Sequence, residues 1–464
     1  MNLASALADA AVAAGRGGAP ALRAGGAPLT YSDVAALQDG AALALRDRGV
    51  RAGDRVALVI RDSPAFIAAF LGAAKIGAIP VPLSTLARPD EVAFMVKDCG
   101  ATVTLTERDP LAASSARLEA VAGAEDAMGF WQYSSGTTGL PKAVIHLARG
   151  ALFPAEAHGT HVAAIRPADR VYSTAKLFFS YGIQNSMLIP LALGASVILD
   201  PERFAPRRAW DIIACERPTV LYSVPTAYAA LLAAAEAGEP ADPSSLRVCI
   251  SAGEALPAPI AERWQRRFGI PVLDGIGSTE IGYIAISNTV EDVVPGSSGR
   301  VIPGYEVRVV GPDGDDAAEG TLWVRGGSTA AGYHDRPEPQ ARAFRDGWVV
   351  TGDRYRVEDG HYFHQGRDDD MLRVGALWVS PLEVEAVLLG HPAVRECAVV
   401  GRADRDGLTN VCAYVVLAED IPTAELADLC SARLARHKRP RWIERVASLP
   451  RTATGKLQRF RRRA

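Results

Sequence analysis

Short apolar runs alternate with helical segments through the first third of this chain, and this alternation restricts its fold more than any other feature. The helical pattern covers residues 35–48, 65–75 and 91–99, and strand-like runs cover residues 53–60, 79–81 and 102–106. Strands separated by helices of this length are typical of parallel α/β layers. We therefore predict an α/β fold.

The remainder of the chain divides into stretches of different character. Short strands between helical stretches are predicted at residues 196–199, 219–222, 248–250 and 272–273. From residue 299 strands dominate, including a predicted hairpin over residues 305–324. A smaller unit follows, with helices predicted at 381–389 and 424–437 and strands at 396–400 and 411–417. We expect a large N-terminal domain (residues 1–367) of layered α/β subdomains with a β-rich third subdomain, and a small mobile α+β C-terminal domain (residues 368–464).

Composition narrows the class of protein. The chain has 464 residues and a formal net charge of −3, which gives no field that would attract nucleic acid or an anionic membrane. Its six cysteines are scattered without a C-x-x-C pair, which favours a reducing cytoplasm over a disulfide framework or a zinc site. One uncharged run, residues 177–199, is long enough to span a membrane. Gln184, Asn185 and Pro190 interrupt it, so we expect a buried strand or helix pair instead.

A loop rich in Ser, Thr and Gly at residues 133–142 carries the strongest chemical signal. Glycines let the backbone approach a ligand closely, and successive N–H groups with hydroxyls and Lys142 can form an anion-binding concavity. The spacing is not that of a Walker A loop. A flexible linker would not lie between the apolar pair Phe130-Trp131 and the β-prone run 143–146. The loop therefore predicts phosphate binding.

Four further stretches place polar groups between apolar elements, where α/β folds bind ligands. They are residues 251–255, 275–280, 351–353 and 450–456. We expect the glycines at 275 and 277 to permit close approach of a flat ligand. Asp353, predicted at the end of a strand, would accept from ribose hydroxyls. Each stretch alone is compatible with an ordinary loop, whereas together they indicate one nucleotide site.

In this order the motifs resemble the adenylate-forming superfamily, which includes acyl- and aryl-CoA ligases, the adenylation domains of peptide synthetases, and luciferase. Within it the chain is most similar to benzoate-CoA ligases, through residues 176–182, 246–256 and 273–281. The resemblance implies a two-step reaction. A carboxylate and ATP give acyl-AMP and pyrophosphate, and a thiol, CoA, then displaces AMP.

The resemblance also implies the ATP-binding residues. In the family's order the phosphate loop would hold the β- and γ-phosphates, Thr279 the α-phosphate, and Glu280 a Mg²⁺ ion, a hard cation that prefers oxygen ligands. Residues 254–255 and 275–276 would line the adenine slot, and Arg367 would reach ribose or phosphate. The full implied set is Ser134, Ser135, Gly136, Thr137, Thr138, Gly139, Lys142, Glu254, Ala255, Gly275, Ile276, Thr279, Asp353 and Arg367.

Two implied residues belong to the small domain. Lys456 would neutralise charge developing between the carboxylate and the α-phosphate, and is the implied catalytic residue. Asp369 matches the family's hinge position. Rotation there would move Lys456 away from the site and open a tunnel for the thiol.

The implied acid pocket departs from the pattern of benzoate-CoA ligases. Its residues are Lys176, Ser180, Tyr181, Gly182, Gly277, Tyr283 and Ile284. Ser180 stands where benzoate-CoA ligases tend to have Ala, and Tyr283 where they tend to have His. We hypothesise that both hydroxyls bind a polar ring substituent, because an unsubstituted ring would leave them unpaired at roughly 1–3 kcal/mol each. Lys176 opens the pocket segment and is a candidate partner for the substrate carboxylate.

Two other departures concern the surroundings of the site. The link over residues 107–129 is short for this family, so an edge of the N-terminal region is expected to be trimmed. Gly375-Ala376 stands where the family usually shows Ser-Gly in the segment that lines the thiol tunnel. The identity of the acceptor thiol is therefore left as either CoA or the phosphopantetheine of a carrier protein.

Other readings are less well supported. A non-catalytic nucleotide-binding relative would be expected to have lost Lys456, Glu280 or Asp353, and all three are present. The basic C-terminal tail has no aromatic stacking platform for nucleic acid, and its arginines are expected instead to meet phosphates of CoA or an acidic carrier protein. The histidines at 146, 158, 361 and 364 form no metal-ligand pattern and are expected to be structural. We leave a homodimer open, because the sequence does not fix the oligomeric state.

Overall fold

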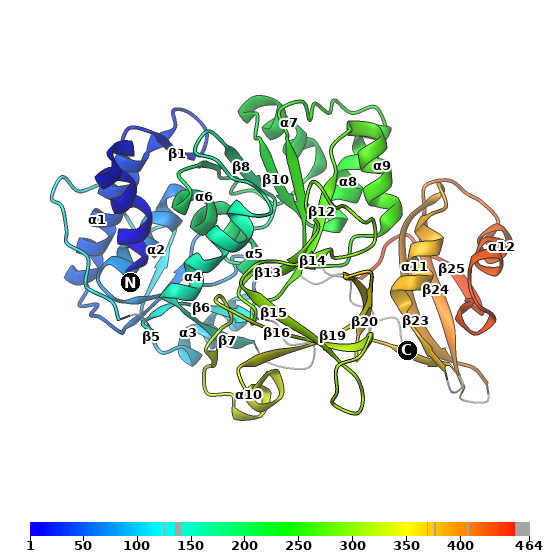
Figure 1. Cartoon of the computed structure of the whole chain (residues 1–464). Helices are drawn as coiled ribbons and strands as arrows, with labels where there is room; N and C mark the ends of the chain where they lie inside the picture. The colour runs from blue at the N-terminus through cyan, green and yellow to red at the C-terminus, as the bar shows by residue number, and fades with distance from the viewer. Residues whose placement is uncertain (125, 135–140, 369, 375–376, 406–407, 451–464) are drawn as a thin grey trace.

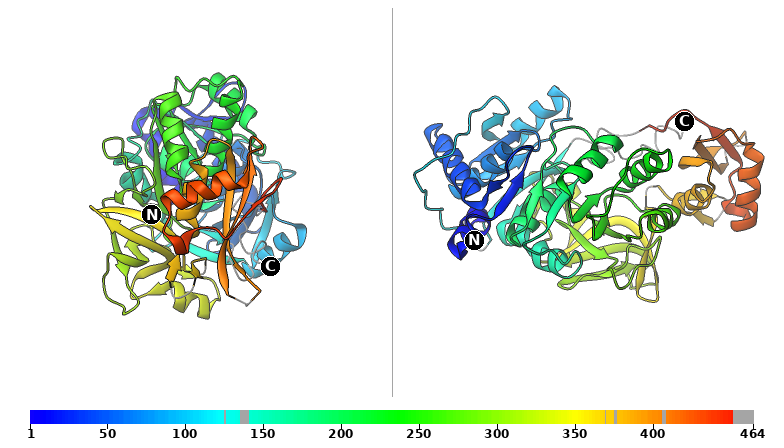
Figure 2. Two further views of the ribbon diagram at one scale, coloured as in Figure 1. Left: turned by 90° about the vertical axis from the view of Figure 1, so that its right-hand side faces the viewer. Right: turned by 90° about the horizontal axis from the view of Figure 1, so that it is seen from above.

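The computed structural model describes residues 1–124, 126–134, 141–368, 370–374, 377–405 and 408–450 (Figure 1). An N-terminal α/β region lies at one end of the molecule and the C-terminal unit at the other, with a large sheet between them (Figures 1 and 2). The predicted class, an α/β protein with a β-rich region and a small C-terminal unit, is confirmed. No helix in the described ranges has the length and apolar character needed to cross a bilayer.

A nine-stranded sheet with the order β14-β13-β12-β11-β10-β8-β9-β1-β2 forms the middle of the molecule. Every neighbouring pair from β12 to β1 is parallel, and the outer pairs are antiparallel. The strands are β1 (Pro20–Arg23), β2 (Leu29–Thr30), β8 (Arg170–Ser173), β9 (Ser196–Ile198), β10 (Val220–Ser223), β11 (Val248–Ser251), β12 (Val272–Gly277), β13 (Ile284–Ser287) and β14 (Arg300–Val301).

Three helices cover one face of this sheet (Figure 1). They are α7 (Pro206–Glu216), α8 (Pro225–Glu236) and α9 (Ala258–Phe268). Their apolar side chains form one buried cluster with the sheet, in which Trp210 and Trp264 stack at 6.1 Å. The helices return the chain so that β10, β11 and β12 run parallel, which places the ends of all three at one edge of the sheet.

A second, three-stranded parallel sheet near the N-terminus has the order β4-β3-β5. The elements are α1 (Tyr31–Asp47), β3 (Arg55–Val59), α2 (Pro64–Lys75), β4 (Ile79–Pro82), α3 (Pro89–Asp98) and β5 (Ala101–Thr106), which confirms the predicted alternation. Local sequence fixes where the helices begin. The Thr30 and Ser63 hydroxyls accept from backbone N–H groups in the first turns of α1 and α2, as N-caps do.

The run that raised the question of a membrane span is a broken helix followed by a buried strand. It forms α5 (Ser180–Ile183), η4 (Gln184–Leu188) and α6 (Ile189–Ala192), and then β9. The helix ends before Gly194, which has a φ of +80°. The predicted interruption by polar residues is confirmed, and Gln184 and Asn185 are both buried.

The β-rich region contains β15 (Tyr305–Val310), β16 (Glu319–Gly326), β18 (Phe344–Arg345), β19 (Trp348–Glu358) and β20 (His361–Arg367). The predicted hairpin is the antiparallel pair β15 and β16. One prediction was wrong, because residues 351–353 do not end a strand. They lie inside β19, where Gly352 adopts a φ of +73° and the pairing with β16 shifts register. This irregularity is what interrupts the pleat beside Asp353.

The C-terminal unit has its own apolar clusters, made only of residues from Leu372 onward. It contains β21 (Leu372–Val374), β22 (Leu377–Val379), α11 (Pro381–Leu389), β23 (Val394–Ala403), β24 (Thr409–Leu417), α12 (Thr423–Arg433), η5 (Arg436–Lys438) and β25 (Trp442–Arg445). The predicted helix over 424–437 is too long. Leu434 leaves α12 with an extended backbone and buries its side chain, and the Arg439 guanidinium donates to the Leu434 carbonyl at 2.9 Å. The domain boundary at residues 367/368 stays a prediction.

Candidate active site

Glu280 is the point at which three distant chain segments meet. The residue lies in the turn between β12 and β13, and its Oε1 accepts from the Ser134 hydroxyl at 3.1 Å and from the Tyr333 hydroxyl at 2.9 Å. Ser134 ends β6 (Met128–Ser134), and Tyr333 ends β17 (Gly332–Tyr333). The predicted metal ligand and the first residue of the predicted phosphate loop are therefore brought together.

The predicted phosphate loop connects the two strands of a hairpin. β6 pairs antiparallel with β7 (Lys142–Leu147), and Ser134 lies opposite Lys142 at the mouth of the loop. The Lys142 ammonium lies 4.7 Å from the centre of the Tyr333 ring, a cation–π contact. Ser135, Gly136, Thr137, Thr138 and Gly139 lie outside the described residues, as do Asp369, Ala376 and Lys456.

Sequence reasoning missed Tyr333. The ring is fixed because β17 pairs antiparallel with β7, with Tyr333 opposite Val144. Burial and the neighbouring Glu280 carboxylate raise the pKa of Tyr333, so the phenol keeps its proton and acts as a donor. A single tyrosine in a two-residue strand gives no periodic signal, and only the long-range pairing reveals its place.

The predicted adenine slot lies where β11 and β12 end. Gly275 and Ile276 are in β12, and Glu254 and Ala255 lie in the bend that follows β11. Asp274, which sequence reasoning also missed, lies between them. Its Oδ2 accepts from the Leu256 N–H at 3.3 Å, and the carboxyl is buried beside the Ser251 hydroxyl. Burial raises the pKa of Asp274 to about 8.

The glycines of β12 have a packing role that was not predicted. A Cβ on Gly275 would lie 2.8 Å from the Ile286 carbonyl oxygen, and one on Gly277 would lie 2.3 Å from the Tyr283 carbonyl oxygen. Close packing of β13 against β12 therefore requires both glycines, whether or not a flat ligand approaches. That they also permit close approach of a flat ligand stays a prediction.

Asp353 and Arg367, the predicted ribose and phosphate residues, lie directly opposite each other on β19 and β20. Their side chains approach to 3.7 Å between Arg367 Nη1 and Asp353 Oδ1. His364 also lies here, with Nε2 3.4 Å from Asp353 Oδ1. It was expected to be structural, and the strand pairing places it beside the predicted nucleotide site. His361, by contrast, is buried and contacts the Asp292 carboxylate at 3.1 Å.

Lys176 is anchored by the protein itself. Its ammonium donates to the Asp200 carbonyl at 2.6 Å, and the neighbouring Leu177 N–H donates to the buried Asp62 carboxyl at 2.9 Å. These contacts fix the start of the segment that leads into α5. Gly182 completes the turn, because a Cβ there would lie 1.9 Å from the Lys176 carbonyl oxygen. Pairing of Lys176 with a substrate carboxylate stays a prediction.

The two hydroxyls assigned to a ring substituent already have protein partners. Tyr283 donates to Asn185 Oδ1, and Ser180 donates to the Gly282 carbonyl at 3.3 Å. The premise that an unsubstituted ring would leave both unpaired was therefore wrong. Tyr181, Tyr283 and Ile284 do come together, since the two tyrosine rings stack at 6.1 Å and Ile284 begins β13.

Comparison with known proteins decides the family. Residues 9–334 match the AMP-binding enzyme family, and residues 383–456 match the AMP-binding enzyme C-terminal domain. This chain belongs to the AMP-binding enzyme family. The predicted resemblance to adenylate-forming enzymes, and to ATP-dependent, AMP-forming acid–thiol ligases among them, is thereby confirmed.

Relatives of this AMP-binding enzyme act on benzoates. The chain is 38% identical to the benzoate–CoA ligase of Thauera aromatica, over 97% of the chain and 93% of that protein. It is 37% identical to the 4-hydroxybenzoate–CoA/benzoate–CoA ligase of Rhodopseudomonas palustris, over 97% of the chain and 92% of that protein. The structure of the anthranilate CoA ligase AuaEII in complex with anthranoyl-AMP superimposes with a TM-score of 0.94 at 36% identity, covering 99% of this chain and 96% of that one.

The residues of this AMP-binding enzyme fit a Mg²⁺ ion shared with phosphates. No group of three or more His, Cys, Asp or Glu in the described part of the chain could hold a metal by itself. Mg²⁺ is commonly bound by one or two carboxylates together with substrate phosphates and water, so a lone Glu280 beside the phosphate loop is a suitable donor set. Ser134 and Tyr333 would orient that carboxylate.

Tyr333→Phe tests this orientation. The variant loses the hydroxyl that donates to Glu280, so we expect the Mg²⁺ concentration for half-maximal pyrophosphate release to rise about tenfold. The KM for the acid should change little. Tyr228→Phe, which removes a buried hydroxyl bonded to the Leu221 and Ile250 carbonyls, is the matched control. An unchanged Mg²⁺ requirement in Tyr333→Phe would contradict the assignment.

Asp62→Asn tests the buried carboxyl behind the pocket segment. Burial raises the pKa of Asp62 to about 7 from its ordinary 3.8, against smaller opposing effects of Lys176 and the Leu177 N–H. Between these two pKa values the folded chain therefore binds more protons than the unfolded chain. The stability that comes from the protonated Asp62 carboxyl is fully present below the ordinary pKa and is lost as the pH rises through about 7. Relative to the asparagine variant, the wild-type free energy of unfolding should fall by roughly 1.4 kcal/mol per pH unit across this window.

Urea unfolding at several pH values measures this difference. Asp211→Asn serves as the control, because that carboxylate is exposed and lies 3.0 Å from the exposed Arg207 guanidinium on the same helix, α7. A stability difference between wild type and Asp62→Asn that stays constant from pH 4 to pH 7 would show that Asp62 is ionised throughout.

Proposed function

We propose that this enzyme uses ATP to activate a hydroxy- or amino-substituted aryl carboxylic acid to its acyl-AMP, and then transfers the acyl group to CoA. One observation carries the proposal. The short segment from β12 to β13 joins the two predicted halves of the site, since Glu280 contacts Ser134 and Tyr333 while Tyr283 packs on Tyr181. The residue proposed to act on the phosphates, Glu280, and a residue proposed to line the aryl pocket, Tyr283, are thus only a few positions apart in the chain.

The first step requires positioning and charge stabilisation more than covalent catalysis. Ser134, Lys142 and the rest of the phosphate loop hold the β- and γ-phosphates. Glu280 would hold a Mg²⁺ ion, which when bound would neutralise charge on the phosphate oxygens. Asp353 accepts from the ribose hydroxyls and Arg367 approaches ribose or phosphate, since both lie on one pair of strands.

Recognition of adenine is shared between the bend after β11 and strand β12. Asp274 adds a buried carboxyl at this edge of the sheet. A protonated carboxyl at this place can donate to a ring nitrogen of the adenine base and accept from its amino group.

The remaining assignments rest on the family. Lys456 supplies the positive charge for adenylation, and rotation at Asp369 removes it before thiol attack. Thr279 binds the α-phosphate. These residues are proposed on their match to the family's motifs in the sequence.

The substituted ring is supported by the names of the relatives, which include a 4-hydroxybenzoate and an anthranilate ligase. It is also supported by the polar character of the pocket, where Tyr181 and Tyr283 stack beside Asn185. An unsubstituted benzoate remains the simplest competing acid.

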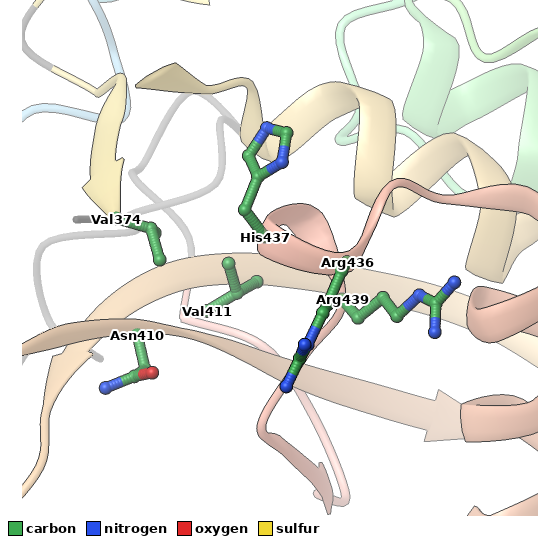
Figure 3. A pocket seen from close by; sticks show the side chains of 6 residues that line it. All are labelled: Val374, Asn410, Val411, Arg436, His437 and Arg439. Atoms are coloured by element: carbon green, nitrogen blue, oxygen red, sulfur yellow. The ribbon is translucent and has the colours of Figure 1, made fainter. Parts of the chain in front are cut away.

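CoA is favoured as acceptor by a basic cleft on the C-terminal unit. Figure 3 shows Arg436 and His437 on η5, with Arg439 next to them, beside Asn410 and Val411 of β24; Val374 of β21 completes the lining. Guanidinium groups match phosphate oxygens in charge and geometry. Such a cleft suits the phosphates of CoA, and an acidic carrier protein is the alternative occupant.

A pyrophosphate-release assay with a panel of aryl acids tests the proposal. We expect release with hydroxy- or aminobenzoates at a higher kcat/KM than with benzoate, and acyl-CoA only when CoA is present. Lys456→Ala is the inactive control. Release without acyl transfer to CoA would favour a carrier protein. No release with any acid, under conditions where the protein is folded, would support a non-catalytic relative.

A further inference from the structure

The β6–β7–β17 sheet, which carries the two hydroxyls that meet on Glu280, has a second face. Ser134 ends β6 and Tyr333 ends β17, and both donate to Glu280 from strands that flank β7. Successive side chains of a strand point to opposite faces of a sheet, so Tyr133 points away from Glu280. It packs instead against a buried cluster that includes Met95 of α3.

A carboxylate on α3, that of Asp98, accepts from residues of both outer strands' segments. Its Oδ2 accepts from the Tyr133 hydroxyl at 2.8 Å, and its Oδ1 accepts from the Arg336 guanidinium at 2.5 Å. Only 11% of the Asp98 side chain is exposed. Burial raises the pKa of Tyr133, and the hydrogen bond to Asp98 acts in the same direction, so the phenol keeps its proton and donates.

The place of Asp98 in its helix does not explain this carboxylate. Asp98 is the last residue of α3, where a negative side chain is unfavourable because the C-terminal end of the helix dipole is also negative. The guanidinium of Arg336 offsets this cost. Asp98 therefore serves a contact between segments rather than the helix that contains it.

Arg336 fixes the chain just beyond Tyr333. Between the two residues, Asp335 adopts a φ of +44°, in the left-handed region that few residues other than glycine occupy. Arg336 donates to the Asp335 carbonyl at 3.0 Å as well as to Asp98. A backbone conformation of this kind persists where surrounding contacts hold it. The ion pair with Asp98 is such a contact.

We propose that Asp98 is a positioning residue for ATP and Mg²⁺, which fixes the ends of β6 and β17 through Tyr133 and Arg336 and thereby orients the Glu280 carboxylate. This inference rests on the proposed function, because it takes Glu280 as the Mg²⁺ ligand. It extends the site into the N-terminal α/β region, since α3 lies in none of the motifs that predicted the nucleotide site.

Asp98→Asn tests the inference with a side chain of the same shape. The amide oxygen can still accept from Tyr133, but it lacks the negative charge that holds Arg336. Isothermal titration calorimetry of the full chain with ATP, at one fixed Mg²⁺ concentration, should show a Kd about tenfold higher than in the wild type. In turnover the KM for ATP should rise by a similar factor while the KM for the aryl acid is unchanged.

A purely structural role for Asp98 predicts a different result. Partial unfolding would lower the binding stoichiometry and kcat, and would leave the Kd of the folded fraction at the wild-type value. Tyr133→Phe keeps the ring and removes only the hydroxyl, so it should raise the Kd in the same direction and by a smaller factor. Combining Asp98→Asn with Arg336→Gln should add little to Asp98→Asn alone, because both changes remove one ion pair.

Asp169→Asn is the matched control. Asp169 is also buried and paired with an arginine, Arg247, at 2.7 Å, but it precedes β8, at the beginning of the parallel strands rather than at their ends. This variant should lose thermal stability and keep the wild-type Kd for ATP.

A wild-type Kd in both Asp98→Asn and Tyr133→Phe would overturn the inference, as would an equal rise in Asp169→Asn. Absence of pyrophosphate release with every acid would overturn the proposed function alone, since weaker ATP binding by Asp98→Asn would still support the inference. A wild-type chain that does not bind ATP in the presence of Mg²⁺ would overturn both.

Discussion

The carboxylate of Glu280 is the contact on which the arrangement of this site depends. Ser134 and Tyr333 approach the same oxygen from strands far apart in sequence, and Lys142 lies over the Tyr333 ring. Neither hydroxyl would be held there without the β6–β7–β17 sheet, in which both strands pair with β7. The sheet thus orients the carboxylate before any ligand binds, which is the property that electrostatic catalysis requires.

The part of the site that is predicted to bind the aryl acid is held by hydrogen bonds within the protein. Its hydroxyls take part in structural hydrogen bonds, as in Tyr283 with Asn185 and Ser180 with the Gly282 carbonyl. The glycines of β12 serve packing against β13, and this packing holds this part of the site close to the phosphate side.

Much of the fold could be predicted because local signals agree with tertiary structure. The alternation of apolar strands and helices gave the elements from α1 to β5 closely, and turn residues located the β15–β16 hairpin. The motifs also identified Glu280 and Ser134, which contact each other in the site. The rest depends on long-range pairing, which periodicity does not encode. Tyr333 and His364 reach the site through the register of β17 and β20, and Asp274 is a polar residue inside an otherwise apolar strand. The premise for Ser180 and Tyr283 failed for the same reason, since their partners come from other segments.

The most direct test of this account is ATP–pyrophosphate exchange driven by an aryl acid and followed across a Mg²⁺ titration in Glu280→Gln. The amide oxygen can still accept from Ser134 and Tyr333, so the variant should keep the wild-type thermal stability. The amide supplies no negative charge to a cation, so exchange should fall by at least about a hundredfold. Exchange at the wild-type rate and the wild-type Mg²⁺ requirement would contradict the central role given to this carboxylate.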